Sequence, residues 1–505
     1  MSIEQRQPRT ALVHDAATAA RLDVAPTALP RARPLAALAR AVHVWALGAR
    51  YMTPALAGRL VRRGDGSARA ARRMFERLGA TYVKFGQFVA SAPGIVGEDV
   101  AEEFRGCLDT GPPVPFDRVR TAIESELGRP LSEAFGSFDE KPLAAASIAV
   151  VHTATLRDGT PVAVKVLRPG IERTAAMDLA LLERLARFTA ARGIDQAYNM
   201  VGLVVGLRLQ VAEELDLRNE ARTMDVFREL YESYGLSLLV VPRVHHELTT
   251  RRVVTMELLD GAPLDDLTHA EALGIDPAPL VRELLKAWVL TGLRVGAFHA
   301  DIHAGNLLLL RDGRLGMIDW GIVARMDEAS RRMFRRLCEA SVGVEEAWAD
   351  IAELMIEVNG PGLYALGLTD EQIHSFARAT FEPVLTQPLR EVSMAELMMN
   401  GDDVVHKATG ERPSRRSLKD RWRLMRDAAS AYRAAAANRV FEEPSMRMGF
   451  LSMKQLVYLE RYGRMYIPDE ALLGDPDFVR SVLDGTHGSD LTPGPLPERE
   501  GELTT

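Results

Sequence analysis

The stretch that decides the fold is HADIHAGNLLLLRDGRLGMIDWG, residues 299–321. It holds Asp301, Asn306 and Asp319 at fixed spacing. Two short apolar runs around Asp312–Gly313 separate the last two residues, which predicts a β-hairpin. In phosphoryl-transfer sites one carboxylate orients the attacking hydroxyl or water, while an amide oxygen and a second carboxylate hold Mg²⁺ on the nucleotide phosphates. The spacing therefore predicts a site for Mg²⁺ and nucleotide.

Length, charge and cysteine content limit the class of protein. The chain has 505 residues, enough for two or three domains with substantial cores, and its net charge of −7 argues against a nucleic-acid binder. Cys107 and Cys338 form no CxxC pair, which favours a reducing compartment without a structural zinc site. We see no signal peptide and no apolar run of about 18 residues, so we expect a cytoplasmic location and no transmembrane helix.

Lysine is rare here, because only seven of the 62 basic residues are lysines. A lysine carries a compact ammonium and an arginine a planar fork, so a retained lysine is a candidate for a special role. Lys84 and Lys165 both lie in apolar surroundings. Lys165 falls in a predicted strand, VAVKV, after an Asp158–Gly159 hairpin turn. Burying an unpaired ammonium is costly, so we expect a carboxylate or phosphate partner, unless the strand is an edge strand with its lysine in water.

The acidic partner should come from residues 199–230, which we predict to be helical and which carry EELDLRNEA. Glu214 and Glu220 are six residues apart and cannot share a helix face, so they should meet different partners. An exposed acidic face is the alternative interpretation. Further along, residues 251–261 read as a strand that runs into a Gly-containing connector. Such a connector suits an adenine-binding hinge, with Glu257 and Leu259 near the base.

Two further segments bear on partners. Residues 34–63 have apolar residues at helical spacing with arginines between them, and we favour a packed amphipathic helix over a membrane-surface helix. The basic stretch 412–438 has the same two interpretations, with a packed stripe again favoured. After Gly321 the chain passes almost directly into a predicted helix at 327–338. It lacks the activation segment and Ala-Pro-Glu anchor of peptide-directed kinases, so we expect no platform for a protein substrate.

Seven motifs in one order now point to a family. They are KFGQ (84–87), AAASIAVVH (144–152), VAVKV (162–166), ELD (214–216), NEA (219–221), HADIHAGN (299–306) and DWG (319–321). Together they resemble the UbiB/AarF family of atypical protein-kinase-like ATPases, over about residues 75–330.

The resemblance implies an α+β, two-lobed protein-kinase-like fold with a small N-lobe sheet and a helical C-lobe. An N-terminal helical extension and a helical C-terminal region would flank it. We expect a disordered N-terminus (1–33), the extension with KFGQ (34–128), the N-lobe (129–262), the C-lobe with the helical C-terminal region (263–480) and a disordered tail (481–505).

The resemblance also implies roles for individual residues, with ATP and Mg²⁺ as cofactors. Asp301 would be catalytic, Lys165 would pair with Glu220 and touch the phosphates, and Asn306 and Asp319 would bind the metal. An alanine-rich loop, Ala144, Ala145, Ala146 and Ser147, would replace the glycine-rich loop of other kinases. Lys84 and Gln87 would reach over the site, with Lys84 facing Glu214 and Asp216, and fill the place of a peptide substrate.

Three functions stay open from the sequence. The first is a kinase-like protein that binds Mg-ATP and hydrolyses it or transfers its phosphoryl group, in support of isoprenoid-quinone or membrane-lipid metabolism. It would act on an unknown lipid or small molecule, with peripheral contact to the inner face of the membrane. The second is a small-molecule phosphotransferase of the aminoglycoside or choline kinase kind, whose catalytic loop also reads HxDxHxxN. The third is a nucleotide-binding regulatory scaffold.

Overall fold

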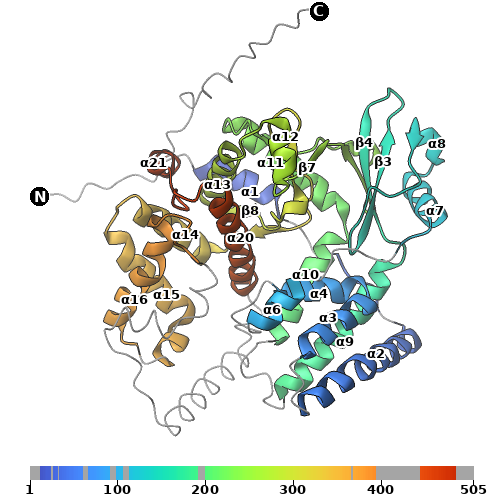
Figure 1. Cartoon of the computed structure of the whole chain (residues 1–505), viewed down its shortest axis with the longest axis horizontal. Helices are drawn as coiled ribbons and strands as arrows, with labels where there is room; N and C mark the ends of the chain where they lie inside the picture. Colours follow the sequence, from blue (N-terminus) through green and yellow to red (C-terminus); the bar gives the residue numbers. More distant parts are fainter. Residues whose placement is uncertain are drawn as a thin grey trace, which may run out of the picture.

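The chain folds into a small lobe built on one sheet and a larger, mainly helical lobe (Figure 1). The computed structural model describes residues 12–23, 27–31, 33–60, 66–90, 98–105, 113–191, 200–365, 368–393 and 444–484. The predicted α+β class with two lobes is confirmed. Among the described residues, no helix is both long and apolar enough to span a bilayer.

The small lobe contains the first sheet, in the order β1-β3-β4-β6 with β2 paired to β3. Asp158 and Gly159 form the predicted turn between β3 and β4: Gly159 has φ 90°, and the Asp158 carboxylate accepts from the Thr160 amide. Alternate valines of β4 pack against α7 (Phe116–Leu127), while Ala163 and Leu167 face the main core. The strands are β1 (Ser137–Phe138), β2 (Ala144–Ala145), β3 (Ala149–Thr155), β4 (Pro161–Leu167) and β6 (Val253–Glu257).

The larger lobe carries a second sheet in the order β5-β10-β9-β7, and residues 258–260 link it to β6 of the first sheet. The predicted hairpin at Asp312–Gly313 is confirmed as β9 and β10. A separate two-stranded pair, β8 and β11, closes the ends of the 299–321 stretch. The strands are β5 (Leu239–Val240), β7 (Gly261–Pro263), β8 (Ala297–His299), β9 (Leu307–Leu310), β10 (Leu315–Met317) and β11 (Val323–Arg325).

Helices surround both sheets. The predicted single helix at 199–230 is wrong, because α10 ends at Glu214 and α11 begins at Leu217. Asp216 caps the second helix by accepting from the Arg218 amide, a preferred role for aspartate. The helices here are α8 (Leu131–Ala134), α9 (Ile171–Ala191), α10 (Met200–Glu214), α11 (Leu217–Ser233), α12 (Leu267–Leu273), α13 (Ala278–Arg294), α14 (Glu328–Ser341), α15 (Glu346–Ala365), α16 (Asp370–Thr386), α20 (Pro444–Tyr466) and α21 (Pro476–Asp484), with short 3₁₀ turns at His246–Leu248 and Ala304–Asn306.

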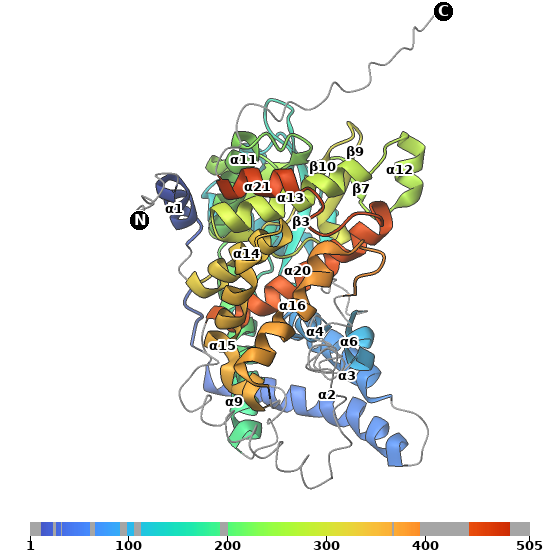
Figure 2. The ribbon, with the colours of Figure 1, turned by 90° about the vertical axis from the view of Figure 1, so that its left-hand side faces the viewer.

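The N-terminal helices form a block that lies against α9 and α10 (Figures 1 and 2). The block consists of α2 (Pro34–Leu60), α3 (Ser67–Leu78), α4 (Ala80–Ala90) and α6 (Glu98–Arg105). The first helix, α1 (Leu12–Arg21), lies apart from the block and contacts α11. The KFGQ motif falls on α4, so Lys84 and Gln87 lie on one helix of the N-terminal segment.

The expected disorder of residues 1–33 is wrong for the part that is described. Leu22 is 1% exposed in the main core, and the Arg325 guanidinium donates to its carbonyl over 2.6 Å. Arg21 binds the Glu229 carboxylate with two nitrogens, at 2.6 and 3.1 Å. Local composition is polar and cannot reveal such distant partners. The predicted basic helix at 412–438 and residues 485–505 lie outside the described residues, while 481–484 belong to α21.

Candidate active site

The 299–321 stretch is held at both ends, which fixes the positions of its carboxylates. β8 pairs with β11 so that His299 lies opposite Val323. The His299 ring accepts from the Asp301 amide at Nδ1 (3.0 Å) and donates from Nε2 to the Asp319 carbonyl (2.6 Å). Burial lowers the pKa of His299 to about 4, so the ring is neutral and this tautomer is fixed. One buried histidine thus ties Asp301 to Asp319.

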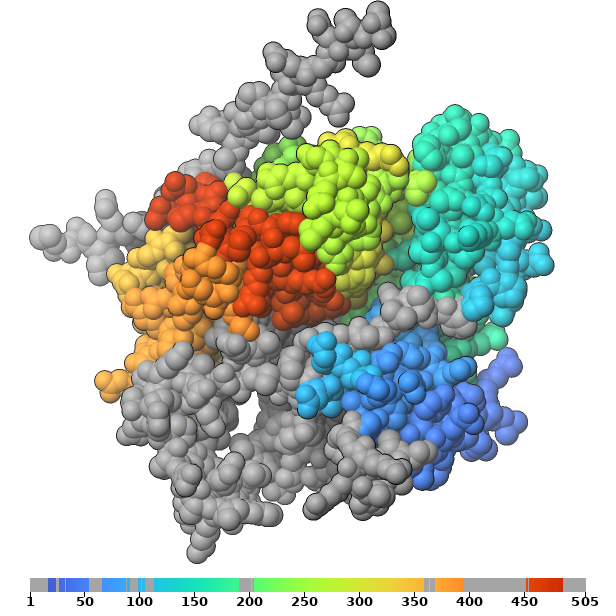
Figure 3. Space-filling view, viewed as in Figure 1, coloured from blue at the N-terminus to red at the C-terminus, as the bar shows by residue number. Residues whose placement is uncertain are grey.

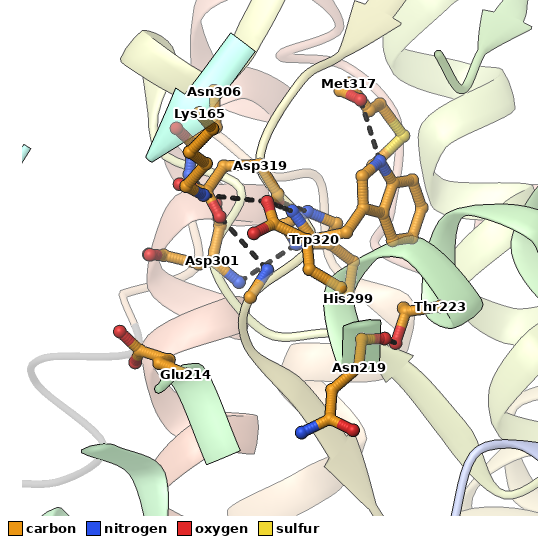
Figure 4. Close-up of polar contacts among 12 residues, drawn as sticks. Lys165, Glu214, Asn219, Thr223, His299, Asp301, Asn306, Met317, Asp319 and Trp320 are labelled. Atoms are coloured by element: carbon orange, nitrogen blue, oxygen red, sulfur yellow. Dashed lines mark hydrogen bonds and ion pairs between the residues drawn. The ribbon is translucent and has the colours of Figure 1, made fainter. Parts of the chain in front are cut away.

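Lys165 bonds to two carboxylates, and Figure 4 shows its side chain beside Asp319. Its ammonium donates to Glu220 over 2.7 Å and to Asp319 over 3.0 Å, from β4 to α11 and to the end of the hairpin. Burial opposes the ammonium form, but the two carboxylates raise the pKa of Lys165 above its ordinary value. Burial also opposes ionisation of Asp319, yet Lys165 and the Gly321 amide lower its pKa. The cluster is therefore an ionised Lys165–Asp319 pair with Glu220 beside it.

Asp301 and Asn306 lie next to each other on the loop before β9. The Asn306 amide nitrogen donates to the Asp301 carbonyl over 2.9 Å, which leaves the amide oxygen as the atom that can bind a cation. The Asp301 carboxylate accepts from Lys454 of α20 over 2.5 Å. Burial opposes ionisation, but Lys454 and His303 hold the pKa of Asp301 below its usual range. Asp301 is therefore ionised and already paired.

Lys84 of α4 reaches the other side of the site. Its ammonium lies 2.5 Å from the Glu214 carboxylate, which also accepts from Gln210 over 3.0 Å. Burial raises the pKa of Glu214 in spite of the neighbouring ammonium. Lys84 thus faces Glu214 as the resemblance implied. Asp216 is different, because its carboxylate is bound by the Arg218 guanidinium over 2.6 and 2.9 Å and caps α11.

The alanine-rich loop is fixed by an arginine that the sequence analysis did not single out. The Arg168 guanidinium donates twice to the Ala146 carbonyl, at 2.9 and 3.0 Å. Ala144 and Ala145 form β2 and pair with β3. The loop can therefore present Ala146 and Ser147 with a rigid backbone, although no glycine is present.

A cavity of about 990 Å³ joins most of these groups. Its lining, within the described residues, includes Lys84, Gln87, Ala146, Ser147, Lys165, Glu214, Asp216, Glu220, Asp301, Asp319 and Lys454. The predicted residues that do not line it are Ala144, Ala145, Glu257, Leu259 and Asn306. Glu257 ends β6, where its carboxylate accepts from the Arg243 amide, and the Leu259 side chain packs beside Gly316 of β10. The two residues predicted to form an adenine-binding hinge therefore do not line the cavity.

The residues present fit a magnesium–nucleotide complex. Asn306 and Asp319 offer hard oxygen ligands, and Mg²⁺ is usually held by one or two protein oxygens together with substrate phosphates. Among the described residues there is no cluster of three or more His, Cys, Asp or Glu that could hold a metal alone. A site that depends on phosphate oxygens agrees with that finding. Lys165 would then meet the phosphates as their fixed cation.

Sequence reasoning missed Lys454 and His299. A signal for Lys454 existed, since lysine is scarce throughout the chain. The signal for His299 was its place at the end of an apolar strand, where a buried ring must find partners for both nitrogens.

The chain resembles known proteins over most of its length. A family model described as the ABC1 atypical kinase-like domain matches residues 107–354. An uncharacterised aarF domain-containing protein kinase of Arabidopsis thaliana, described as chloroplastic, is 34% identical, over 80% of this chain and 73% of its own. An uncharacterised Mycobacterium tuberculosis protein is 33% identical, over 84% and 80%. A probable protein kinase UbiB of Xylella fastidiosa is 32% identical, over 71% and 65%.

Among solved structures, a Mycobacterium tuberculosis complex of Rv3197 with erythromycin aligns with 71% of this chain and 84% of its own, at 23% identity and a TM-score of 0.40. The two-lobed fold and the Lys165–Glu220 pair beside Asp319 define a kinase-like protein. The relatives that cover most of its length place it more narrowly: the chain belongs to the ABC1, or aarF/UbiB, family of atypical kinase-like proteins.

Proposed function

We propose that this protein binds Mg-ATP and hydrolyses it or transfers its γ-phosphoryl group. The observation that carries the proposal is the convergence of Lys165, Asp301 and Asp319 on one cavity, each held by an ion pair. Preorganised charges of this kind are the main contribution a protein makes to phosphoryl transfer. Bound Mg²⁺ would neutralise charge on the phosphate oxygens.

Each residue of the set has a defined task in this proposal. Lys165, kept charged by its carboxylate neighbours, binds the phosphates. Asp319 and the amide oxygen of Asn306 supply the metal ligands. Asp301 is ionised and accepts the proton of the attacking hydroxyl or water. Lys84 and Gln87 of α4 guard the cavity opposite the loop, as a gate that limits access.

The acceptor we propose is a small molecule, a lipid or water. Only β11 and the Asp327 cap lie between Gly321 and α14, so the chain is too short there for a peptide-binding segment. The cavity is within the size range of small-ligand pockets. A phosphotransferase of the aminoglycoside or choline kinase kind is the second candidate, favoured by this same cavity. A scaffold that binds nucleotide without turnover is the third.

We further propose a cytoplasmic protein that supports isoprenoid-quinone or membrane-lipid metabolism through peripheral membrane contact. The support for contact is one face of α2, where Leu35, Leu38, Val42 and Trp45 are 61–82% exposed. Exposed apolar stripes of this kind, next to arginines, suit the interface of a membrane. No acidic residue occurs in α2.

The test of the proposed function is the stabilisation of the folded chain by nucleotide. At 100 times its Kd, Mg-ATP should raise the free energy of unfolding of the wild type by about 2.7 kcal/mol. Asp319→Asn should lose most of this gain, because a metal ligand and the Lys165 partner are both weakened. Thermal unfolding with Mg-ATP, ATP alone and Mg²⁺ alone measures the difference. An equal gain in the variant would remove Asp319 from the metal site.

A further inference from the structure

Three lysines line the cavity, each bonded to a carboxylate. Lys165 and Lys84 belong to motifs that the family resemblance includes. Lys454 does not, since it lies on α20, 100 residues beyond the end of the matched family model at residue 354. Three of the chain's seven lysines therefore meet in one site.

α20 docks on the catalytic loop residue by residue. Lys454 binds the Asp301 carboxylate, and the Tyr462 hydroxyl donates to the Ile302 carbonyl over 3.0 Å. The rings of Tyr458 and His303 lie 6.4 Å apart between centroids. Residues 454, 458 and 462 are four apart and so share one helix face. Residues 301–303 of the loop each contact a different turn of α20, and these contacts fix the position of the Lys454 ammonium.

Helix α20 packs against the centre of the larger lobe. In the space-filling view, the red segment that contains α20 lies directly against the green and yellow central segment (Figure 3). Arg461 binds the Asp265 carboxylate over 2.8 Å, and the Tyr466 hydroxyl donates to the Leu264 carbonyl. These contacts hold α20 on the same side of the larger lobe as the Lys454 contact.

The Lys454–Asp301 pair leaves the cavity open. The two side chains are 16% and 17% exposed, and both belong to the wall of the 990 Å³ space. An ammonium has three N–H donors, so its contact with Asp301 uses one of them. The pair is therefore compatible with a nucleotide and an acceptor in the same cavity.

The Lys454 ammonium balances one of the negative charges that line the cavity. Within the described residues, seven carboxylates line the cavity. Those of Glu213, Asp216 and Glu460 pair with arginines. The other four pair with lysines and are those of Glu214, Glu220, Asp301 and Asp319. Lys84 binds the first of these four, and Lys165 binds the second and the fourth. Lys454 is the lysine bonded to Asp301. Without it, the Asp301 carboxylate would lose the ion pair that holds it in place beside the reacting group.

We propose that Lys454 is a positioning residue of the active site: its ammonium orients the Asp301 carboxylate and offsets its charge as the phosphoryl group is transferred. The inference rests on the proposed Mg-ATP function and adds helix α20 to the active site. Because Lys454 acts through Asp301, it should affect the rate of turnover more than the binding of nucleotide.

The test uses the full chain with Lys454→Met, which keeps the length of the side chain and removes its charge. The kcat for ATP turnover should fall about 10- to 100-fold, while KM for Mg-ATP stays within about threefold. Lys286→Met is the matched control, because Lys286 is also a helical lysine, bonded to Asp475 over 2.8 Å and remote from the cavity lining. Its kcat should match that of the wild type.

A second variant separates positioning from folding. Lys454→Ala should regain part of its kcat when ethylamine is added, because the amine supplies the missing ammonium. Ethylamine should do nothing for Lys286→Ala. Mg-ATP should stabilise Lys454→Ala as much as the wild type in thermal unfolding, and Lys454→Gln serves in its place if the alanine variant does not fold.

The outcomes divide clearly. An unchanged kcat in Lys454→Met would overturn the inference alone, and so would a raised kcat, which would make the pair an inhibitory contact. Loss of turnover without amine rescue, together with loss of Mg-ATP stabilisation, would reduce Lys454 to a structural role. If the wild type is not stabilised by Mg-ATP, the proposed function and this inference fall together.

Discussion

Two helices from outside the matched kinase-like region, α4 and α20, wall the same cavity with a lysine each, yet the lysines meet different carboxylates. Lys84 of α4 binds Glu214, at the end of a helix and beside Gly321 at the end of the 299–321 loop. Lys454 of α20 binds Asp301 on that loop. Both contacts are 2.5 Å long and both pairs are largely buried.

The two carboxylates differ in the role that we expect for each. Glu214 has a buried environment that raises its pKa, so its lysine chiefly offsets a desolvation penalty. In the proposed function, Asp301 takes the proton of the acceptor. The same type of ion pair should therefore serve stability on the α4 side and rate on the α20 side.

Asp301→Asn is the variant for which we expect the largest effect, and it tests whether the α20 side of the cavity determines the rate. We expect ATP turnover to fall on the order of 10³-fold, because an amide cannot take the proton of the acceptor. Asp475→Asn is the control, since it alters the aspartate of a lysine pair outside the cavity lining. Steady-state turnover of both purified variants measures the effect. A loss of less than tenfold would mean that Asp301 is not the catalytic carboxylate.

Lys84→Met tests the α4 side through stability and pH. Removing one partner of a buried pair should lower the free energy of unfolding by about 3 kcal/mol at pH 8. The pKa of Glu214, already raised above 4.5 by burial, rises further without the ammonium. As pH falls through this raised pKa toward 4.5, the folded variant binds a proton before the unfolded chain does. Its deficit in free energy of unfolding, relative to the wild type, should therefore shrink in that range.

Urea unfolding of wild type and Lys84→Met between pH 8 and pH 5 measures the deficit. A deficit that stays constant over this range would show that Glu214 does not titrate in the variant. ATP turnover of the same variant reports on the gate, because removal of Lys84 should ease access to the cavity.

Tyr462→Phe should have the smallest effect. It removes the hydroxyl that donates to the Ile302 carbonyl, and a single buried hydrogen bond contributes about 1 kcal/mol. Tyr231→Phe is a matched control, since that hydroxyl has only a weak contact with the Met317 sulfur at 4.0 Å. Thermal unfolding compares the two. Equal losses would indicate that the α20–loop hydrogen bond adds nothing to stability.

Much of the site could be predicted because its physics is local. A lysine in a valine-rich strand must find an anion, and the structure contains the expected contact with Glu220. The Asp158–Gly159 and Asp312–Gly313 turns fixed two hairpins for the same reason, since they need only neighbouring residues. The break before α11 was also within reach, because Asp216 is a typical helix cap.

What could not be predicted depends on distant partners. Nothing near Leu22 shows that it is buried, and nothing near Lys454 shows that it meets a residue 153 positions earlier. The prediction that Glu257 and Leu259 lie near the adenine base was wrong for a different reason. The connector 258–260 does join the two sheets. The Glu257 carboxylate, however, accepts from the Arg243 amide, and the Leu259 side chain packs on the β10 side, so neither lines the cavity.

The docking of α20 also sets an order in time during synthesis. Asp301 is made 153 residues before Lys454. At ribosomal rates of ~5–20 residues per second, this interval is roughly 8–30 s. Throughout it, the nascent chain holds the Asp301 carboxylate without the ammonium that pairs with it in the finished protein. If the proposed function holds, ATP chemistry by the chain awaits the arrival of a segment that lies beyond the matched kinase-like region, so incomplete chains carry the motifs without the Lys454 contact.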